Sequence, residues 1–436
     1  MNKLRNVLRV RKGMKNAGMQ EDNLLSLSYG RVIRKDLDST EGLLPDSFET
    51  YQIVEPGNIV MRLTDLQNDK RSLRQGLVTE RGIITSAYDA LEVRKDSDPR
   101  FWAYALLALD LAKYYYSLGG GVRQSVKFSD FPNDWLATPD TQTQKSIADF
   151  LDRETTRIDQ LMEKKERLAS VANEKQAAFS EDVISGALHS ETTPTSGRSG
   201  AIRFLPRGWT ETRLRFGIRR IEQGWSPQCE ERSVDGDEWG VLKLGSITTG
   251  VFNENAHKAL PTALSPILKY AVHRGDVLVA RASGSPALVG KACLVYEIKK
   301  QLMISDKHYR LELDEAAFDK SFFVHFLNSR LSRVQIESRL SSAEGMARNI
   351  GQDVIKSIWI AMPPREEQAR IARLIDMSSN RIVALNSRVA RSVSRLAEFR
   401  SALITAAVTG QIDVAMWGKQ GNTDRRLDKI EEALRA

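Results

Sequence analysis

The clearest alternation of apolar and polar positions lies in the last quarter of the chain. Between residues 363 and 412, apolar side chains recur every seven positions, with polar or charged residues filling most of the intervals. A seven-residue period predicts an α-helix whose narrow apolar stripe packs against a second helix. The repeating positions are Ile375, Ile382, Val389, Leu396 and Leu403.

Residues at both ends of this segment fit the ends of one long helix. Pro364 suits the first turn, where its missing N–H is not needed, and Glu366 and Glu367 suit the positive end of the helix dipole. Gly410 suits a left-handed residue that closes the last turn. The sequence therefore predicts a continuous helix over residues 363–412.

The phrase that opens this helix occurs twice. "PDTQTQKSIADFLD" at Pro139 aligns without a gap with "PPREEQARIARLID" at Pro363, 224 residues later. The same offset places Gln144 on Gln368 and, at the far end, Gly186 on Gly410. Self-similarity over so long a period indicates a duplicated structural unit, so a first long helix is expected over residues 139–188.

Charge favours pairing of the two helices with each other. Asp140–Leu188 carries seven Lys/Arg and ten Asp/Glu, whereas Pro364–Ile412 carries eight Arg and four Asp/Glu. Opposite net charge disfavours pairing of either helix with its own kind. We expect an antiparallel pair in which the first helix contributes Leu151, Ile158, Leu161 and Phe179, and the second its heptad residues.

A globular segment precedes each helix. Residues 1–138 and 201–362 share weak echoes, including "ITSAYDALEV" at Ile84 and "ISDKHYRLEL" at Ile304, and each contains strand-like and helix-like patterns. A polar stretch at 189–200 reads as a linker, and 413–436 forms a tail that we expect to lie against the first domain. The fold prediction is α+β: two mixed α/β domains separated by two long antiparallel coiled-coil helices, with a pseudo-two-fold internal repeat.

Composition narrows the class of protein. The chain has 436 residues and a formal charge of +8, which permits a polyanionic partner. No stretch approaches the roughly 20 apolar residues of a membrane span. Two cysteines cannot build a disulfide framework, and five scattered histidines lack metal-ligand spacing. We therefore expect a cytoplasmic protein without metal, cofactor or membrane partner.

These features resemble the specificity subunit of a type I restriction–modification system. The resemblance rests on "PPREEQARIARLID" with its long helix and "AAVTGQI", on the duplication, and on "LPRGWTETRLRFGIRRIEQGWSPQ" at Leu205, "WGVLKLGSI" at Trp239 and "LLSLSYGRVIRKD" at Leu24. It implies two target-recognition domains, each reading half of a bipartite site in double-stranded DNA. It also implies docking of two modification (methyltransferase) subunits on the helices, and of restriction (translocase–nuclease) subunits on that core.

The first copy departs from the second at its start. "KLRNVLRV" at Lys3 resembles "RLRFGIRR" at Arg213, so the first domain has no counterpart of Leu205–Trp209. This leaves open an inactive remnant, or an interaction scaffold without a DNA role.

Side chains that commonly contact bases and phosphates cluster in corresponding loops of the two domains. The candidates in the first domain are Arg31, Arg34, Lys35, Arg62, Asn68, Lys70, Arg71, Arg74, Arg123 and Gln124. The candidates in the second domain are Lys243, Arg281, Ser283, Ser285, Lys291, Arg348 and Asn349.

No spacing marks a catalytic site. "GSPALVGKA" at Gly284 resembles a phosphate-binding loop, but five residues separate its glycines where four are needed, and Ala292 stands where Ser or Thr would hold Mg²⁺. An NTPase is thus the weaker alternative. The sequence predicts a non-catalytic DNA-binding subunit, with catalysis supplied by partners.

Overall fold

The computed structural model describes residues 1–11, 14–28, 30–35, 45, 47–66, 73–118, 125–194, 202, 204–340 and 348–417. These divide into two compact units. Unit 1 takes the described residues of Met1–Arg167 and those from Val389 on, and unit 2 is Leu168–Arg388. Each long helix is therefore shared between the units. No described helix contains an apolar stretch long enough to cross a membrane.

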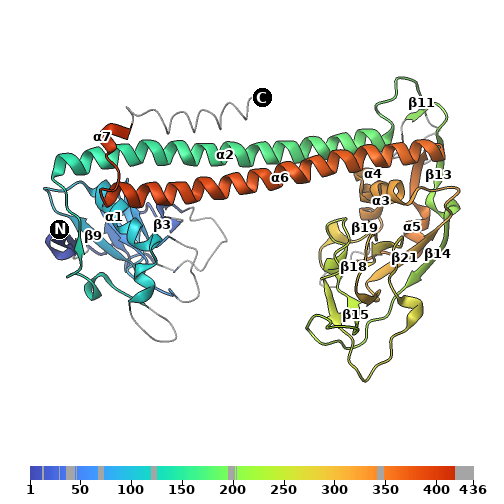
Figure 1. Cartoon of the computed structure of the whole chain (residues 1–436), viewed down its shortest axis with the longest axis horizontal. Coiled ribbons are helices and arrows are strands. Elements are labelled where there is room, and N and C mark those ends of the chain that lie inside the picture. Colours follow the sequence, from blue (N-terminus) through green and yellow to red (C-terminus); the bar gives the residue numbers. More distant parts are fainter. Residues whose placement is uncertain are drawn as a thin grey trace. The chain divides into compact units, whose positions relative to one another are not determined.

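Unit 1 is built around a four-stranded antiparallel sheet in the order β2-β9-β6-β7, with further two-stranded pairs beside it. Helix α1 (Pro99–Leu111) packs on this sheet, with Phe101, Trp102 and Leu106 fully buried (Figure 1). The strands are β1 (Asn2–Lys3), β2 (Leu8–Val10), β3 (Leu25–Ser28), β4 (Arg31–Arg34), β5 (Gln52–Val54), β6 (Ile59–Met61), β7 (Gln75–Leu77), β8 (Gly82–Ile84), β9 (Asp89–Val93) and β10 (Trp135–Leu136).

Unit 2 has a four-stranded antiparallel sheet in the order β14-β21-β17-β19, covered by α3 (Lys320–Asn328) and α4 (Arg330–Glu337). Its other strands form a three-stranded sheet, β16-β15-β20, and three pairs. The strands are β11 (Thr192–Pro194), β12 (Phe204–Pro206), β13 (Thr210–Arg213), β14 (Ile218–Gln223), β15 (Trp239–Leu242), β16 (His257–Ala259), β17 (Val277–Ala280), β18 (Ala282–Ser283), β19 (Ala292–Leu294), β20 (Gln301–Met303), β21 (His308–Leu313), β22 (Arg348–Asn349) and β23 (Trp359–Met362), with a short helix α5 (Gln352–Ser357).

The two main sheets have the same topology. In each sheet the first strand along the chain (β2 or β14) lies at one edge, and the last strand along the chain (β9 or β21) lies next to it. The second strand (β6 or β17) follows, and the third (β7 or β19) forms the other edge. In both units a two-stranded antiparallel pair, β1·β10 or β13·β23, also joins the start of the domain to its end. The internal repeat expected from the helix phrase therefore extends to the domains.

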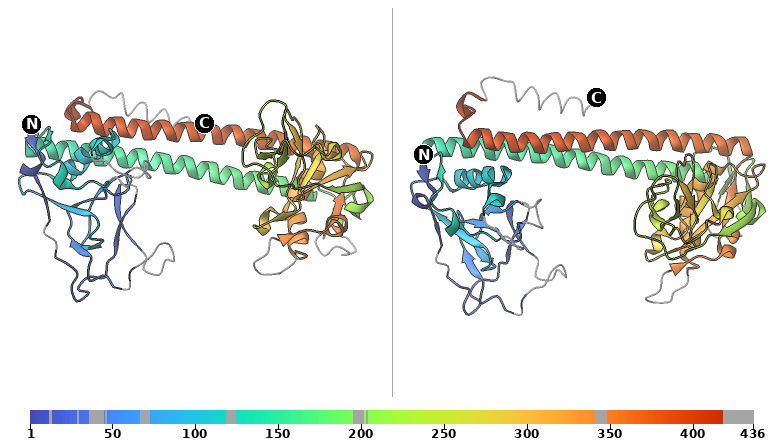
Figure 2. Two further views of the ribbon diagram at one scale, coloured as in Figure 1. Left: turned by 90° about the horizontal axis from the view of Figure 1, so that it is seen from below. Right: turned by 60° about the horizontal axis from the view of Figure 1, so that its bottom comes forward.

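The long helices are α2 (Thr141–Ser185) and α6 (Arg365–Val408), and they lie side by side (Figures 1 and 2). They are antiparallel, since Asp159 pairs with Arg400 at 2.9 Å in unit 1 and Gln176 Nε2 donates to Ser379 Oγ at 2.9 Å in unit 2. The predicted coiled coil is thus confirmed. Of the predicted seam residues, Ile382 and Phe179 are half-buried, and the others are buried: Leu151, Ile158, Leu161, Ile375, Val389, Leu396 and Leu403.

The repeated glutamine of the helix phrase fastens each long helix to its own domain. Gln144 Oε1 accepts a hydrogen bond from the backbone N–H of Asp98 at 2.9 Å, and Asp98 is the N-cap of α1. Gln368 Oε1 accepts from the backbone N–H of Asp319 at 2.9 Å, and Asp319 is the N-cap of α3. Each glutamine also donates Nε2 to the carbonyl of the proline that opens the phrase, Pro139 at 2.9 Å or Pro363 at 3.0 Å.

A carboxylate eight positions later repeats this arrangement with different partners. Asp152 of α2 accepts hydrogen bonds from Arg100 (2.8 Å) and Tyr104 (2.9 Å) of α1. Its counterpart Asp376 of α6 contacts Ser321 (3.3 Å) and His325 (2.7 Å) of α3. The two partner side chains lie two and six residues after the N-cap in both units, so the geometry is kept while the chemistry differs.

The described part of the tail packs on unit 1. Helix α7 (Val414–Trp417) places Val414 and Trp417, together with Ile412, against the core of this unit, and the Trp417 ring lies edge-on to Phe150 at 5.7 Å. This agrees with the expectation for the start of the tail, whereas residues 418–436 lie outside the described part. Part of the expected linker differs from the prediction, because Thr192–Pro194 pairs with β12 as a strand.

Candidate nucleic-acid interface

Two of the predicted recognition segments of unit 2 meet in space. Strand β18 pairs with β22, so that Ser283 lies opposite Arg348 and Ala282 opposite Asn349. The backbone N–H of Ile350 also donates to the carbonyl of Arg281 at 2.9 Å. Segments some 65 residues apart in the sequence therefore form one edge. Arg348 and Asn349 are exposed on it, as is Ser285.

In unit 1 an equivalent backbone hydrogen bond joins the corresponding two segments. The backbone N–H of Val126 donates to the carbonyl of Leu63 at 2.9 Å, at the position where unit 2 joins Ile350 to Arg281. The segments that meet here flank predicted contact residues that lie outside the described part of the chain. Those residues are Asn68, Lys70, Arg71, Arg123 and Gln124.

The side chain of Arg281 packs behind this edge more than it forms part of its exposed surface. Its side chain is half-buried over the Tyr309 ring at 6.0 Å, and Nη1 donates to the carbonyl of Asp306 at 3.3 Å. Its backbone N–H donates to the carbonyl of Lys307 at 2.8 Å, which brings exposed Lys307 next to the β18–β22 pair. Lys307 is not among the predicted contact residues, because its segment "ISDKHYRLEL" indicates only a strand. In the described structure no ion pair engages Lys307 or Arg348.

The remaining candidates of unit 2 have other surroundings. Lys243 pairs with Glu231 at 3.0 Å. Ser283 is buried, and its Oγ accepts from the backbone N–H of Ser285 at 3.1 Å, so it shapes the turn. Lys291 is half-buried, and burial, with the nearby Arg333, lowers the pKa of its ammonium.

Arg74 corrects one prediction for unit 1. Its side chain is fully buried, and its guanidinium donates to Tyr116 Oη and to the carbonyl of Thr64, both at 3.2 Å. Its backbone N–H donates to Asp110 at 2.7 Å. A buried guanidinium held in this way is part of the core, since a DNA contact requires an accessible side chain. The polar sequence of this segment does not distinguish Arg74, whose side chain is buried, from exposed loop residues.

The other cations of unit 1 are accessible but already paired or half-buried. Arg31 pairs with Asp159 of α2 at 2.6 Å, and Arg34 forms a two-pronged pair with Glu80, at 2.6 Å for Nη2. Exposed pairs of this kind contribute little to stability, so both guanidinium groups can exchange partners at small cost. Lys35 and Arg62 are half-buried.

The segment that resembles a phosphate-binding loop lacks the necessary geometry. Pro286–Leu288 is a single 3₁₀ turn, and the chain continues into strand β19. A phosphate-binding loop leads into an α-helix whose N-terminal amides face the phosphates. Within the described residues, no group of three His, Cys, Asp or Glu side chains is arranged to hold a metal ion.

Comparison with known proteins identifies the relatives of this fold. No family model matches the sequence. The chain is 33% identical over 205 residues to the Escherichia coli type I restriction enzyme EcoEI specificity subunit, a match that covers 47% of this chain and 34% of that protein. It is 22% identical to the StySPI specificity subunit of Salmonella potsdam, over 75% of this chain and 68% of that protein.

A solved structure described as the structural basis underlying complex assembly and conformational transition of the type I R-M system has the same fold. It aligns with a TM-score of 0.64 at 16% identity, covering 94% of this chain and 97% of that one. The resemblance seen in the sequence is therefore confirmed: the chain is a relative of type I specificity subunits.

Proposed function

We propose that this relative of type I specificity subunits is itself the DNA-reading subunit of a type I restriction–modification complex. Each domain reads one half of a bipartite site in double-stranded DNA, through the edge where its two recognition segments meet. In unit 2 that edge presents Arg348, Asn349, Ser285 and Lys307. These residue types donate and accept hydrogen bonds at base edges and phosphates.

One observation carries the proposal: the chain contains the same domain–helix unit twice, with different side chains on equivalent loops. The sheet order, the loop closure and the glutamine contacts with α1 and α3 are all repeated. A duplicated scaffold with divergent loops suits the reading of two unlike half-sites. In this proposal the paired helices α2 and α6 set the interval between those half-sites.

We further infer that the chain is not catalytic and that its helices dock partners. Apolar side chains are exposed on α2 and α6 of unit 2, where they have no counterpart to cover them among the described residues: Leu168 (40% exposed), Val171 (39%), Leu374 (45%), Met377 (55%) and Val383 (63%). Exposed apolar residues on long helices support docking of other helices. The partners are two modification (methyltransferase) subunits, and restriction subunits join the complex.

The test is a map of methylated bases. The chain is co-expressed with the modification subunit encoded beside it, in a host without such marks, and modified bases are located by single-molecule sequencing. A two-part motif with a fixed unspecified gap is expected. Absence of new methylation, with both proteins soluble and associated, would instead favour a scaffold or an inactive remnant.

Removal of one heptad from both helices tests the role of the coiled coil separately. The gap between the half-sites should change while the half-sites themselves stay the same. Altered half-sites would contradict a spacing role for the helices.

A further inference from the structure

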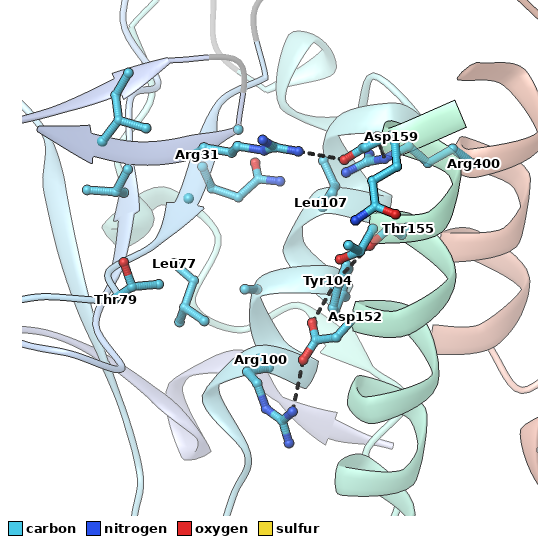
Figure 3. A pocket seen from close by; sticks show the side chains of 18 of the residues that line it. Arg31, Leu77, Thr79, Arg100, Tyr104, Leu107, Asp152, Thr155, Asp159 and Arg400 are labelled. Carbon is cyan, nitrogen blue, oxygen red and sulfur yellow. Dashed lines mark hydrogen bonds and ion pairs between the residues drawn. The ribbon is translucent and has the colours of Figure 1, made fainter. Parts of the chain in front are cut away.

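Unit 1 contains a groove of about 850 Å³, of whose lining residues Arg31 alone is a predicted DNA contact. Its walls are the hairpin β3–β4 with strand β7 on one side and α2 on the other, and α1 forms the floor (Figure 3). The hairpin packs closely because β7 has Gly76 here: a Cβ at this position would lie 2.7 Å from Leu27 and 3.0 Å from Val32. This glycine therefore allows the close packing that forms one wall of the groove.

Gln75, next to this glycine, is a buried polar side chain. It lines the groove, it is only 2% exposed, and neither Nε2 nor Oε1 has a hydrogen-bond partner among the described residues. An amide left unsatisfied in this way costs about 1–3 kcal/mol. A partner that brings both a donor and an acceptor, as a peptide group does, would satisfy it.

The charges along the groove favour a basic partner. Asp159 is neutralised between Arg31 (2.6 Å) and Arg400 (2.9 Å), and Asp152 is paired with Arg100 (2.8 Å) (Figure 3). Glu163 and Glu166, one helical turn apart on the α2 wall, are exposed. In the described structure no ion pair or hydrogen bond involves their carboxylates.

Among the described residues, this arrangement occurs in unit 1 and not in unit 2. The residues 224 positions after Asp159, Glu163 and Glu166 are Val383, Ser387 and Ala390. The residue that corresponds to Gln75 in sheet register is Ala292, which pairs with Val279 as Gln75 pairs with Met61. Asn328 binds both the N–H (2.9 Å) and the carbonyl (2.8 Å) of Ala292, so no free amide faces outward there.

We propose that the groove binds a basic segment of one modification subunit, so that two subunits docked on the paired helices are held unequally. This inference rests on the proposed function. Gln75 pairs with a peptide group of that segment, and Glu163 and Glu166 receive its Lys or Arg side chains. The exposed apolar residues of the helices offer a docking surface to the modification subunit on unit 2, whereas the copy on unit 1 relies on the groove.

The experiment measures how many modification subunits bind, by native mass spectrometry of the full chain mixed with purified modification subunit. Two copies are expected on the wild-type chain, and one on the double variant E163R/E166R at the same protein concentration. Glu174→Arg, an exposed acidic position on α2 in unit 2, is the matched control and should retain two copies.

Gln75→Leu separates binding from folding. Replacement of an unpartnered buried amide by an apolar side chain of similar size should leave the thermal midpoint unchanged or raise it. Binding of the modification subunit on unit 1 should nevertheless weaken about tenfold. Two copies retained with unchanged affinity in both the E163R/E166R and Gln75→Leu chains would overturn the inference while leaving the proposed function intact. Failure of the wild-type chain to bind any modification subunit would overturn both.

Discussion

Gly186 and Gly410 end the two long helices in the same left-handed conformation, with φ of +76° and +71°, but their surroundings differ. A Cβ on Gly186 would lie 2.3 Å from Pro206 Cγ, whereas a Cβ on Gly410 would meet no described residue within 4 Å. In both cases the next residue donates its N–H to a carbonyl five positions back, from Ala187 to Asp182 and from Gln411 to Ala406, each at 2.9 Å. The helix ending is repeated, and its packing is not.

This difference predicts unequal effects of the same substitution. Gly410→Ala should lower the free energy of unfolding by about 1–2 kcal/mol, the cost of a left-handed non-glycine residue. Gly186→Ala should cost at least about 2 kcal/mol more, because Pro206 or the helix end must also move. Thermal unfolding of the two variants measures this. Equal losses would mean that the contact with Pro206 relaxes freely.

The buried glutamines predict a second pair of effects. Gln144→Ala or Gln368→Ala removes the acceptor for the N-cap amide of α1 or α3 and should destabilise the corresponding unit by about 1–3 kcal/mol. Gln142→Ala is the control, because Gln142 is exposed on the first turn of α2. Urea unfolding followed by tryptophan fluorescence reports the change. A loss for Gln142→Ala as large as that for Gln144→Ala would point to helix propensity instead of the buried contact.

The proposed DNA-reading edge of unit 2 is tested by Arg348→Ala and Asn349→Ala. Each should weaken binding to the cognate duplex by about 1–3 kcal/mol, or roughly 5–150-fold, if the residue contacts a base. If Arg348 instead contacts a phosphate, its loss should weaken binding to all DNA sequences alike. The slope of log affinity against log salt concentration should then fall by about one. Lys299→Ala, at an exposed cation paired with Glu297, serves as the control. Unchanged affinity in both test variants would exclude this edge.

His308 predicts a pH dependence of stability in unit 2. Burial lowers the pKa of its imidazole from 6.5 to about 4, and the ring is held between Ser305 Oγ (2.7 Å) and Ser246 Oγ (3.3 Å). Between pH 6.5 and 4 the unfolded chain binds a proton that the folded chain does not, so stability falls as pH is lowered through this window. At pH 5 the loss should approach about 2 kcal/mol.

The measurement compares the thermal midpoint of the wild-type chain with that of His308→Gln at pH 7 and pH 5. Carboxylates titrate alike in both proteins. The change in midpoint from pH 7 to pH 5 therefore differs between the two proteins by the contribution of His308. The wild-type midpoint should fall several degrees further than that of the variant. Parallel shifts would show that the imidazole is accessible to protons in the folded state.

Helices, repeat and seam could be predicted from the sequence because they depend on local periodicity. Ile375, Leu396 and Leu403 are buried as the seven-residue spacing requires, and the glycine ends follow from the need for positive φ. The common sheet order of the two domains was only suggested by weak echoes such as "ITSAYDALEV" and "ISDKHYRLEL". These echoes contain the corresponding strands β9 and β21, each of which lies second in the order of its own sheet.

The candidate site was less predictable because it depends on contacts distant in sequence. Nothing local distinguishes Arg74, which turns into the core toward Tyr116, from the accessible arginines near it. Lys307 is brought next to the proposed DNA-reading edge by the backbone hydrogen bond from Arg281, which is 26 residues away in the sequence. The burial of Gln75 without a hydrogen-bond partner among the described residues likewise depends on how β7, α1 and α2 pack together, so the sequence alone does not predict it.

The contacts of Gln144 and Gln368 have a consequence for how such proteins diversify. Each glutamine binds the backbone of an N-cap residue and of a proline, and neither bond depends on a recognition loop. A domain of foreign origin needs only a helix that begins with aspartate at this place, and a side chain six residues later that can bond to a carboxylate, as Tyr104 and His325 both do. Under the proposed function, recombination at the helix phrase would therefore replace one half of the recognised sequence in a single event, without any adjustment of the other half.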